Sequence, residues 1–455
     1  MVFRKAVTTL WLHKKKSVFF TGVAVFAARV GRNRYHDATI LQEACLEAAR
    51  IGEAPLPENE HPRRVTVLLN RFANDGKASR TFERFGLPLL HLAGLELTVL
   101  QPDSADELER LASALDETEA DALLVVGGDG TLSKAVKGAL MGEFAAERDS
   151  ASSPPLPLAV LPAGRENRTF RLWKENVDVG SSARLPAAVM CESVMALVRG
   201  RATSKIRPAL LKTTAKDGET PAAEEVLLSG LRWGSFCNAE QRQPKFWYLG
   251  ALKAHFAYLV TRYWPLSFDL SVAPPCAGCA RCRGEAGSAK PASKAATGNA
   301  SDSSPWWRKL VGVPLLNTAA AAPSGEARPA AATLVSNPDC GRLVDGGAVV
   351  CGGELAVALR QQPTAQLDVT TAPADGVAGQ WAFLRQGWRR HPLFGSGAAT
   401  DHGPFQSCDA LKVTTRGELA EPLRRVSVDG ESVRLRAIGE SFTVKLIPGT
   451  LRFFL

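Results

Sequence analysis

The chain has 455 residues, of which 45% are hydrophobic and 22% are charged. This composition excludes a wholly disordered or collagen-like protein and is sufficient for two or three core-forming domains. The net charge of +9 comes from 55 basic and 46 acidic residues, but the first 36 residues hold eight of the basic ones and no acidic one. The rest of the chain is close to neutral, with 47 basic residues against 46 acidic ones, which argues against a nucleic-acid-binding body.

Residues 1–36 form a basic and apolar arm. Three lysines, Lys14 to Lys16, are followed by an apolar run of 12 residues from Ser17 to Ala28. A bilayer-spanning helix needs about 20 apolar residues, so we expect no ordinary spanning segment here. The arm is consistent with a mitochondrial targeting or membrane-anchoring segment, with a secretory signal peptide, or with a flexible basic tail. The basic residues that continue through Arg29–Tyr35 favour the mitochondrial interpretation.

An alternating series of helices and strands follows the arm. Residues 37–61 are predicted to form a helix and a proline-containing linker. Four buried strands are then predicted, at 65–69, 95–100, 122–126 and 157–161. The helix after the second strand starts with a capping box, Ser104-x-x-Glu107. Strands separated by helix-length segments are typical of a doubly wound parallel sheet, so residues 62–202 are predicted to be an α/β domain.

The hydrophobic pattern changes to a period of two in the C-terminal half. Phe442–Leu446 and Leu411–Val413 alternate apolar and polar side chains, as half-buried antiparallel strands do. Residues 203–455 are therefore predicted to be a β-rich domain. Alanine, glycine, serine and proline interrupt it at about 274–333, which we interpret as a low-complexity insert. Its one apolar island, Trp306–Leu316, either packs back onto the domain or touches a membrane or a partner.

The nine cysteines are odd in number and mostly scattered, which argues against a disulfide scaffold. Cys276, Cys279 and Cys282 have a spacing found among metal ligands. They lie inside the low-complexity insert, however, and no fourth ligand follows at a suitable spacing. The sequence therefore disfavours a metal site there.

The segment from Leu124 to Leu132, Leu-Val-Val-Gly-Gly-Asp-Gly-Thr-Leu, is the most informative part of the sequence. A buried strand runs into three glycines, an aspartate and a threonine, and then into an amphipathic helix. Glycines let a phosphate approach the main chain, and a helix start offers free N–H groups and the positive end of a dipole. Asp129 could orient a metal or take a proton from an attacking hydroxyl, and Thr131 could donate a hydrogen bond to a phosphate. The alternative is an ordinary tight turn.

The standard nucleotide motifs do not account for this turn. No P-loop follows Gly76-Lys77, and Ser133 stands where a dinucleotide fingerprint would have its third glycine. The sequence has neither the G-x-S-x-G of a serine hydrolase nor the H-E-x-x-H of a zinc protease. The absence of these motifs argues against a P-loop protein, a dinucleotide-binding protein, a serine hydrolase and a zinc protease.

Four further segments stand around the Gly-Gly-Asp-Gly turn in a particular order. They are Asn70 before Gly76-Lys77, Pro162-Ala163-Gly164-Arg165-Glu166-Asn167, Gly230-Leu231-Arg232-Trp233-Gly234-Ser235-Phe236 with Phe246-Trp247-Tyr248-Leu249-Gly250 after it, and Val428-Asp429-Gly430-Glu431. Together they resemble the diacylglycerol kinase catalytic-domain superfamily, which includes sphingosine, ceramide and acylglycerol kinases. The Gly-Leu-Arg-Trp-Gly-Ser-Phe and Trp-Tyr-Leu-Gly segments, with the arm, are most similar to the mitochondrial acylglycerol kinases. The resemblance runs from about residue 35 to the C-terminus, apart from the insert.

This resemblance implies a phosphofructokinase-like nucleotide-binding domain followed by a β-sandwich, with ATP and the active site between them. It implies that Asp129 is the general base. The residues that it implies for ATP binding are Asn70, Lys77, Gly127, Gly128, Gly130, Thr131, Gly164, Asn167 and Glu431. It implies lipid contacts from Trp233 and Asn238, and it implies that Asp429 approaches the nucleotide or Mg²⁺.

Three positions depart from the family pattern. Arg71 stands where the family usually has proline, and Glu166 replaces the second glycine of a G-x-G-N turn. Asn238 stands where related kinases often carry an aspartate that faces the lipid headgroup. The core motif is intact, so the resemblance implies an ATP- and Mg²⁺-dependent kinase that converts mono- and diacylglycerol into lysophosphatidic and phosphatidic acid. Asn238 leaves sphingosine or ceramide as alternative acceptors.

The resemblance also implies a location and partners. It places the protein at the mitochondrial inner membrane, facing the intermembrane space, with a membrane lipid as its substrate. It implies a second role as a subunit of the inner-membrane carrier translocase, and in the alternative the kinase fold is only a scaffold for membrane-protein import. We expect no nucleic-acid partner.

Overall fold

The structure is a computed structural model, and the helices and strands of its described residues belong to one compact unit made of residues 1–274 and 341–455. The residues that it describes are 14–55, 61–115, 118–144, 156–174, 187–200, 204–214, 221–276, 340–351, 353–361, 364–372, 379–390, 406–416, 419–434, 441–447 and 450–455. Most of the predicted insert lies outside them, as do the Trp306–Leu316 island, Cys279 and Cys282.

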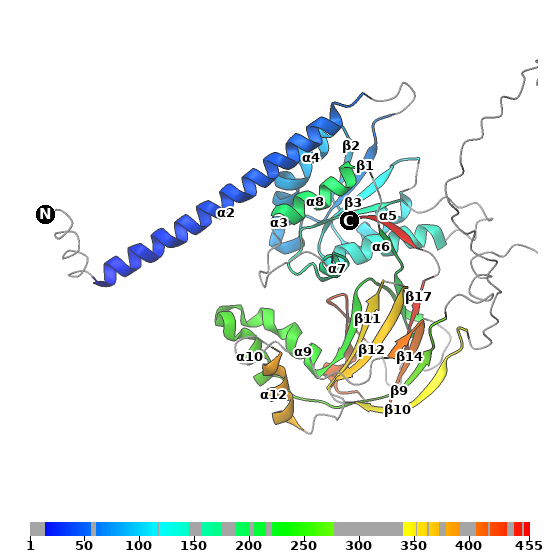
Figure 1. Cartoon of the computed structure of the whole chain (residues 1–455). Coiled ribbons are helices and arrows are strands. Elements are labelled where there is room, and N and C mark those ends of the chain that lie inside the picture. Colours follow the sequence, from blue (N-terminus) through cyan, green and yellow to red (C-terminus); the bar gives the residue numbers. More distant parts are fainter. Residues whose placement is uncertain are drawn as a thin grey trace, which may run out of the picture. The chain divides into compact units, whose positions relative to one another are not determined.

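The first domain is built on a six-stranded sheet with the order β2-β1-β3-β4-β18-β5 (Figure 1). All neighbouring strands are parallel except the last pair, β18 and β5. The bounds of the strands are β1 Arg64–Leu69, β2 Glu96–Leu100, β3 Ala122–Gly127, β4 Leu158–Pro162, β5 Ser204–Ile206 and β18 Leu451–Phe454. Every residue of β3 and β4 is buried, so these central strands are covered on both faces, as in a doubly wound sheet.

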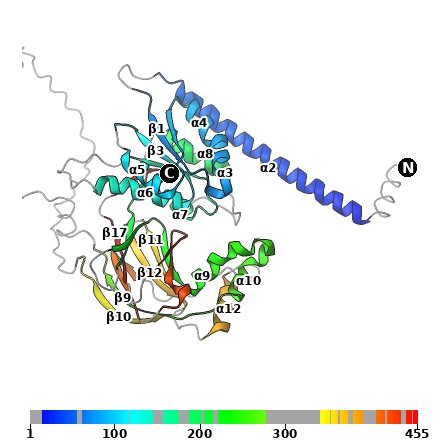
Figure 2. The same ribbon diagram turned by 180° about the vertical axis from the view of Figure 1, so that it is seen from behind.

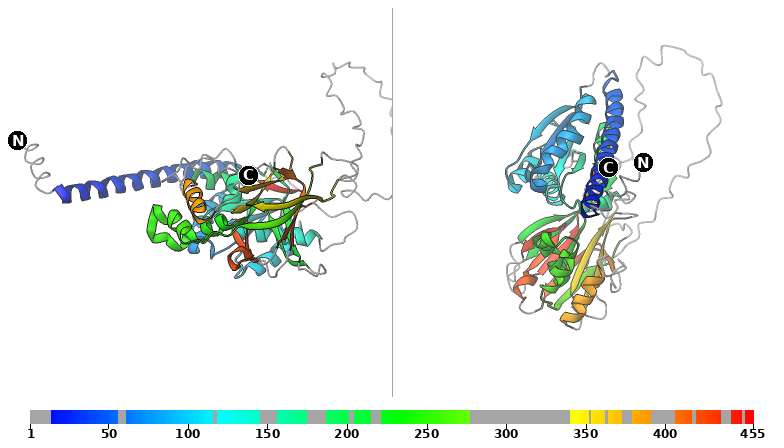
Figure 3. Two further views of the ribbon diagram at one scale, coloured as in Figure 1. Left: turned by 90° about the horizontal axis from the view of Figure 1, so that it is seen from below. Right: turned by 90° about the vertical axis from the view of Figure 1, so that its left-hand side faces the viewer.

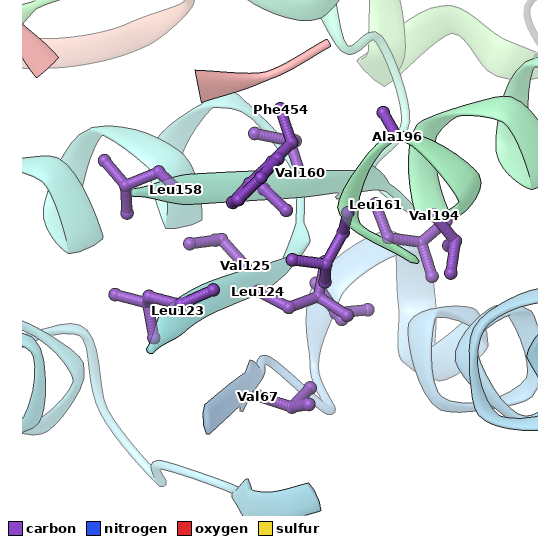
Figure 4. Close-up of a cluster of buried hydrophobic side chains, with 14 of the residues drawn as sticks. Val67, Leu123, Leu124, Val125, Leu158, Val160, Leu161, Val194, Ala196 and Phe454 are labelled. Atoms are coloured by element: carbon purple, nitrogen blue, oxygen red, sulfur yellow. The ribbon is translucent and has the colours of Figure 1, made fainter. Parts of the chain in front are cut away.

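Two groups of helices cover this sheet. One group packs α2 against α4 and α8, and the other packs α5 against α6. The bounds of the helices are α2 Lys14–Gly52, α3 Ala73–Thr81, the π-helix η1 Phe82–Gly86, α4 Leu87–Leu92, α5 Ala105–Ala114, α6 Asp129–Phe144, α7 Arg168–Trp173 and α8 Ala187–Val198. Figure 4 shows how Val194 and Ala196 of α8 lie beside Val160 and Leu161 of β4 in the shared core.

The C-terminal strand β18 returns to the first domain. Phe453 and Phe454 pair with Leu158 and Ala159 of β4 in parallel, and both phenylalanines are buried. The expected boundary between residues 202 and 203 therefore does not separate the sheets, because β5 and β18 both lie beyond it and complete the first sheet. A four-residue apolar strand carries no local signal that tells which sheet it joins.

The second domain consists of two six-stranded antiparallel sheets, with the orders β10-β9-β14-β17-β6-β7 and β13-β12-β11-β8-β15-β16. Apolar side chains of both sheets form one common core. The bounds are β6 Ala209–Thr214, β7 Pro221–Leu227, β8 Gly230–Gly234, β9 Leu266–Ala273, β10 Val344–Cys351, β11 Glu354–Arg360, β12 Gln366–Ala372, β13 Gln406–Cys408, β14 Ala410–Thr415, β15 Arg425–Val428, β16 Glu431–Arg434 and β17 Ser441–Leu446.

A helical layer, which the sequence pattern did not predict, interrupts the strands of the second domain. Its elements are α9 Ser235–Arg242, the 3₁₀ segment η2 Gln243–Leu252, α10 Lys253–Leu259 and α12 Gln380–Arg389, with a short 3₁₀ turn η4 Glu421–Arg424 elsewhere in the domain. Helix α10 packs against both α9 and α12, and the three helices lie together at one end of the sheets (Figures 1 and 2). These helices have a core of their own around Phe236, Tyr258 and Phe383.

Helix α2 joins the arm to the first domain as one continuous helix of 39 residues (Figure 3). Its C-terminal part packs on the domain through Ala44 and Ala48, whereas Phe19, Phe20 and Phe26 are exposed. Within the described residues, no helix is both long enough and apolar enough to cross a membrane.

Candidate active site

The site begins where β3 passes into α6 through the Gly-Gly-Asp-Gly turn. Strand β3 ends at Gly127 and α6 begins at Asp129, so the predicted strand–turn–helix geometry is present. The turn packs against the loop after β4, and Gly164 N donates to Gly127 O at 3.0 Å. A Cβ atom on Gly164 would lie 2.3 Å from Gly128 Cα. Only glycine allows the two backbones to approach this closely.

Asn167 fixes the loop after β4. Its backbone is left-handed, with φ at 50°, and its side chain is buried. Its Oδ1 accepts from Gly164 N at 3.0 Å, and its Nδ2 donates to the carbonyl oxygens of Pro162 and Gly164 at 3.1 Å each. The side chain is thus occupied within its own loop, and its role is to position Gly164.

Asp129 connects this turn to α7. Its Oδ2 accepts from Arg168 N and its Oδ1 accepts from Thr169 N, both at 2.9 Å. The carboxylate therefore caps the first turn of α7, where a negative charge is favourable. A carboxylate has about four lone-pair sites, so two amide bonds leave capacity for a hydroxyl donor. The aspartate is held rigidly and can still accept a proton.

The loop after β1 completes this edge of the sheet. Asn70 Nδ2 donates to Thr131 Oγ1 at 2.9 Å, and Asn70 Oδ1 accepts from Phe72 N at 3.0 Å. The three residues from Asn74 to Gly76 are left-handed, which interrupts α3. Arg165 forms an ion pair with Asp75 in this turn, at 2.9 Å. Lys77, predicted to contact ATP, is exposed and is not among the residues that line the cavity described next.

A cavity of about 400 Å³ lies at the carboxyl ends of β1, β3 and β4. We call it the first cavity. Ligands of open α/β sheets bind in this position. Its lining includes Asn70, Asn74, Gly128, Gly130, Thr131, Lys134, Gly164, Arg165 and Glu431. Six of the nine residues predicted for ATP binding are therefore brought together here, whereas Asn74, Lys134 and Arg165 were not predicted because no motif singles them out.

Glu431 reaches the first cavity from the second domain. A Cβ on Gly130 would lie 1.6 Å from Glu431 Oε1, so this glycine is what allows the carboxylate to approach the start of α6. Partial burial raises the pKa of Glu431, and the neighbouring Glu225 and Asp129 raise it further, while Lys134 opposes them. Lys134 itself is ion-paired with Glu225 of β7 at 2.9 Å. The first cavity thus combines acidic and basic groups from both domains.

A second cavity, of about 300 Å³, adjoins this arrangement. Its lining is formed by Glu166, Arg168, Arg232, Cys237, Glu240, Gln241, Pro244, Ser427, Gly430 and Ser432. Neighbouring residues divide between the two cavities, because Arg165 and Glu431 line the first while Glu166, Gly430 and Ser432 line the second. The loop after β4 and the β15–β16 turn therefore contribute residues to both cavities. Asp129 itself is not among the lining residues of either cavity, but it binds the amide of Arg168, which lines the second.

Buried charges support the second cavity. Arg232 forms ion pairs with Glu240 and Glu354, and Arg390 pairs with Glu354 at 2.7 Å. Burial alone would lower the pKa of Arg232, but the two carboxylates raise it overall. The same guanidinium outweighs burial at Glu240 and lowers the pKa of that carboxyl. Tyr258 OH also donates to Glu240, at 3.1 Å. Glu240 is thus held ionised beside the cavity.

Three residues predicted to contact ligands have structural roles instead. Trp233 is fully buried in the core between the two sheets, and its Nε1 donates to Leu423 O at 2.7 Å. Asn238 is also buried, and its Nδ2 donates to Pro422 O at 2.8 Å. Both were assigned by position in a motif, which does not tell which way a side chain points. Neither lines the two cavities described above.

Asp429 is the third of these residues. It is 3% exposed, and its carboxylate accepts four hydrogen bonds, from the amides of Leu228, Ser229 and Gly230 and from Ser229 Oγ. These donors hold the β7–β8 turn against the β15–β16 turn. The geometry argues against Asp429 as a Mg²⁺ ligand. In the part of the chain that the structure describes, no group of three or more His, Cys, Asp and Glu side chains is arranged to hold a metal ion.

Two family models and several known proteins are similar to this chain. Residues 64–194 match the diacylglycerol kinase catalytic domain, and residues 228–290 match the acylglycerol kinase C-terminal region. The chain is 31% identical to an uncharacterized Caenorhabditis elegans protein, over 67% of this chain and 64% of that protein. It is 30% identical to mouse mitochondrial acylglycerol kinase, over 58% of each chain. A crystal structure of a putative diacylglycerol kinase from Bacillus anthracis aligns with a TM-score of 0.45, at 13% identity, over 87% of this chain and 98% of that one.

Residues 64–194, which hold the Gly-Gly-Asp-Gly turn and the loop after β4, are similar to the diacylglycerol kinase catalytic domain, so the resemblance expected from the motifs is confirmed. In its C-terminal match and its curated relatives, the chain is similar to the acylglycerol kinases. The chain spans less than two thirds of the length of these relatives.

Proposed function

We propose that this protein is an ATP-dependent lipid kinase that transfers the γ-phosphate of ATP to the hydroxyl of monoacylglycerol and diacylglycerol. The observation that carries the proposal is the position of Asp129. This rigidly held carboxylate lies between Gly128 and Gly130, which line the first cavity, and it accepts from the amide of Arg168, which lines the second. One cavity has the glycine-lined helix start that suits a nucleotide. The other has the polar, charged lining that suits a small hydroxylated headgroup.

In the proposed reaction, the nucleotide phosphates lie in the first cavity against Gly128, Gly130 and the amides at the start of α6. Thr131, held by Asn70, donates to a phosphate oxygen. The acceptor hydroxyl enters from the second cavity and donates to Asp129. A bond forms between the hydroxyl oxygen and the γ-phosphorus while the bond to the bridging oxygen of ADP breaks, and the proton passes to Asp129. ADP and the phosphorylated lipid are the products.

Glu431 is a better candidate for a Mg²⁺ ligand than the buried Asp429. Mg²⁺ in kinases is usually bound by one or two carboxylates together with substrate phosphates. Glu431 lines the first cavity, and the nearby Asp129 and Glu225 disfavour its negative charge, which a cation would relieve. When bound, the ion would neutralise the charge of the β- and γ-phosphates.

The proposed acceptor class is supported by the relatives and by the second cavity. Its lining contains paired charges, with Glu166 and Arg168 in an ion pair of 3.0 Å, and this balance suits a neutral glycerol headgroup. Sphingosine kinases of Arabidopsis are more distant relatives, at 24% identity over 42% of this chain, so a sphingoid acceptor is the alternative. Because Asn238 is bound to Pro422 O, we do not assign acceptor choice to it.

We also propose the finer features that the resemblance implies. These are a phosphofructokinase-like first domain, a β-sandwich second domain, and a location at the mitochondrial inner membrane facing the intermembrane space. The relatives named as mitochondrial and the acid-free arm support this location. A second role in the inner-membrane carrier translocase is compatible with catalysis, and the intact Asp129 site favours a protein that is more than a scaffold.

The test is phosphorylation of a panel of lipids by the purified full chain. Monoacylglycerol, diacylglycerol, ceramide and sphingosine are presented separately in detergent micelles with radiolabelled ATP and Mg²⁺. We expect labelled lysophosphatidic and phosphatidic acid. Labelling of sphingosine or ceramide alone would show that the acceptor is a sphingolipid and not an acylglycerol. Labelling of none of the four lipids would overturn the proposed function.

A further inference from the structure

The helical layer of the second domain exposes a group of large apolar side chains. Trp381 of α12 is 82% exposed, and Trp247 and Tyr248 of η2 are 78% and 63% exposed. Large aromatic side chains are seldom left this exposed in groups without a binding role. We call this surface the aromatic platform and define it by Trp247, Tyr248, Leu252, Phe256, Leu259 and Trp381.

Helix α10 has apolar side chains on both of its faces. Leu252, Phe256 and Leu259 follow the spacing of one helical face and are exposed. The opposite face buries Ala257 and Tyr258 against the small core of the helical layer. A helix that is apolar all round is normally covered on both sides, by protein or by lipid. Among the described residues, only one side of α10 is covered.

The platform is held in shape by contacts beneath it. The rings of Phe246 and Phe256 are in contact, with centroids 4.9 Å apart. Trp388 Nε1 of α12 donates to the carbonyl oxygen of His255 in α10 at 3.1 Å. These contacts fix η2, α10 and α12 to one another, so the exposure of the platform belongs to a packed unit.

Basic residues surround the platform and acidic ones are missing from its elements. Residues 241–262 include Arg242, Lys245, Lys253 and Arg262 and no acidic residue. Residues 379–390 likewise include three arginines and no acidic residue. The chain beyond the arm is otherwise nearly neutral. Lys245 and Lys253 are exposed beside the aromatic side chains. The surface therefore combines exposed apolar side chains with positive charge, which is complementary to a lipid surface with anionic headgroups.

We propose that the aromatic platform docks this protein on the surface of a phospholipid bilayer that contains anionic lipids. Tryptophan and tyrosine are favoured at the membrane interface, where the ring is in the apolar zone and its polar atom meets the headgroups. Lysine and arginine add attraction to anionic headgroups. Pro244 lines the second cavity and lies three residues before Trp247, so the platform continues from the rim of that cavity. Docking here would bring that cavity to the lipid surface.

The first test measures insertion of the platform tryptophans directly, because the arm could also hold the full chain on vesicles. Full-length protein is mixed with vesicles of phosphatidylcholine and about 30 mol% phosphatidylserine whose acyl chains carry bromine, a short-range quencher of tryptophan fluorescence. We expect quenching of the wild-type protein and the loss of most of it in W247F/W381F. Equal quenching of the two proteins would overturn the proposal.

The second test measures the charge contribution on unbrominated vesicles of the same composition. Each interfacial lysine should strengthen binding about fivefold, so K245Q/K253Q should bind about 25-fold more weakly than the wild type. The matched control is K412Q, an exposed lysine on β14 away from the helical layer. Equal affinities of K245Q/K253Q and K412Q would contradict the proposal. Neither test depends on catalysis, so failure of docking and failure of the kinase proposal are distinguishable: lipid phosphorylation in detergent micelles tests only the latter.

Discussion

Gly164→Ala tests whether the close packing of two glycine turns builds the active site. The new Cβ would lie 2.3 Å from Gly128 Cα, 3.0 Å from Gly128 N and 2.6 Å from Asn167 Oδ1. Ordinary contact begins at 3.4 Å, so Gly128 would have to move away by about 1.1 Å. Two of these three atoms belong to the backbone, so no change of rotamer relieves the overlap. Forcing extra atoms into a packed site costs about 1–3 kcal/mol.

The same shift should impair catalysis more than it impairs folding. Gly128 precedes Asp129, and a displacement of about 1 Å at a reacting centre can reduce the rate by about 10²-fold. The measurements are urea unfolding and the kcat of lipid phosphorylation. Gly31→Ala is the control, because its Cβ would meet no atom within 4 Å and it lies on the exposed part of α2. A Gly164→Ala protein with native stability and native kcat would refute the packing argument.

Three further experiments test individual contacts. Asp429→Asn places an amide N–H group among buried hydrogen-bond donors. Each buried donor left unpaired costs about 1–3 kcal/mol, so the urea midpoint should fall. An unchanged midpoint would contradict the structural role of Asp429. Because the pKa of Glu431 is raised, the folded chain keeps the carboxyl proton to higher pH than the unfolded chain does. The free energy of unfolding should therefore fall as the pH rises through the folded pKa, and Glu431→Gln should not show this fall. Parallel pH profiles of stability for the two proteins would contradict this expectation. Asn70→Ala should weaken ATP binding in a calorimetric titration more than Lys77→Ala, because Asn70 binds Thr131 whereas Lys77 lies outside the first cavity, and the reverse order would show that the cavity is misassigned.

Local patterns predicted four of the six strands of the first sheet. The strands β1, β2, β3 and β4 each begin and end within one residue of the predicted positions. Continuous apolar runs bounded by turn residues leave little freedom for a buried strand. The prediction that all four are buried is wrong for β2, because β2 is an edge strand whose residues are exposed or half-buried. One half of the predicted capping box is present, since Ser104 Oγ accepts from Glu107 N at 3.1 Å. The carboxylate of Glu107, however, accepts from Asp103 N rather than from the cap residue.

The remaining features depend on contacts between distant parts of the chain. Asp429 is held by amides about 200 positions away, and nothing in the Asp-Gly-Glu motif tells that its aspartate is buried while its glutamate faces a cavity. Strand β18 joins β4 across nearly 300 residues. The exposure of the apolar residues of η2 and α10 could not be predicted, because the sequence alone does not show which face of a helix is covered. The direction of the side chains, rather than the type of residue, separates the residues that line the first cavity from Trp233 and Asp429.

Asp129→Asn is the measurement that tests the central claim most directly. The variant keeps one acceptor for the α7 amides and removes the charge and the base. General-base assistance is typically worth about 10²–10⁴-fold, so the kcat of acylglycerol phosphorylation should fall by that factor. The urea midpoint should fall by no more than a helix cap contributes, about 0.5–2 kcal/mol, and ATP should still bind. Near-native kcat in a pure Asp129→Asn protein would contradict the assignment of Asp129 as the proton acceptor.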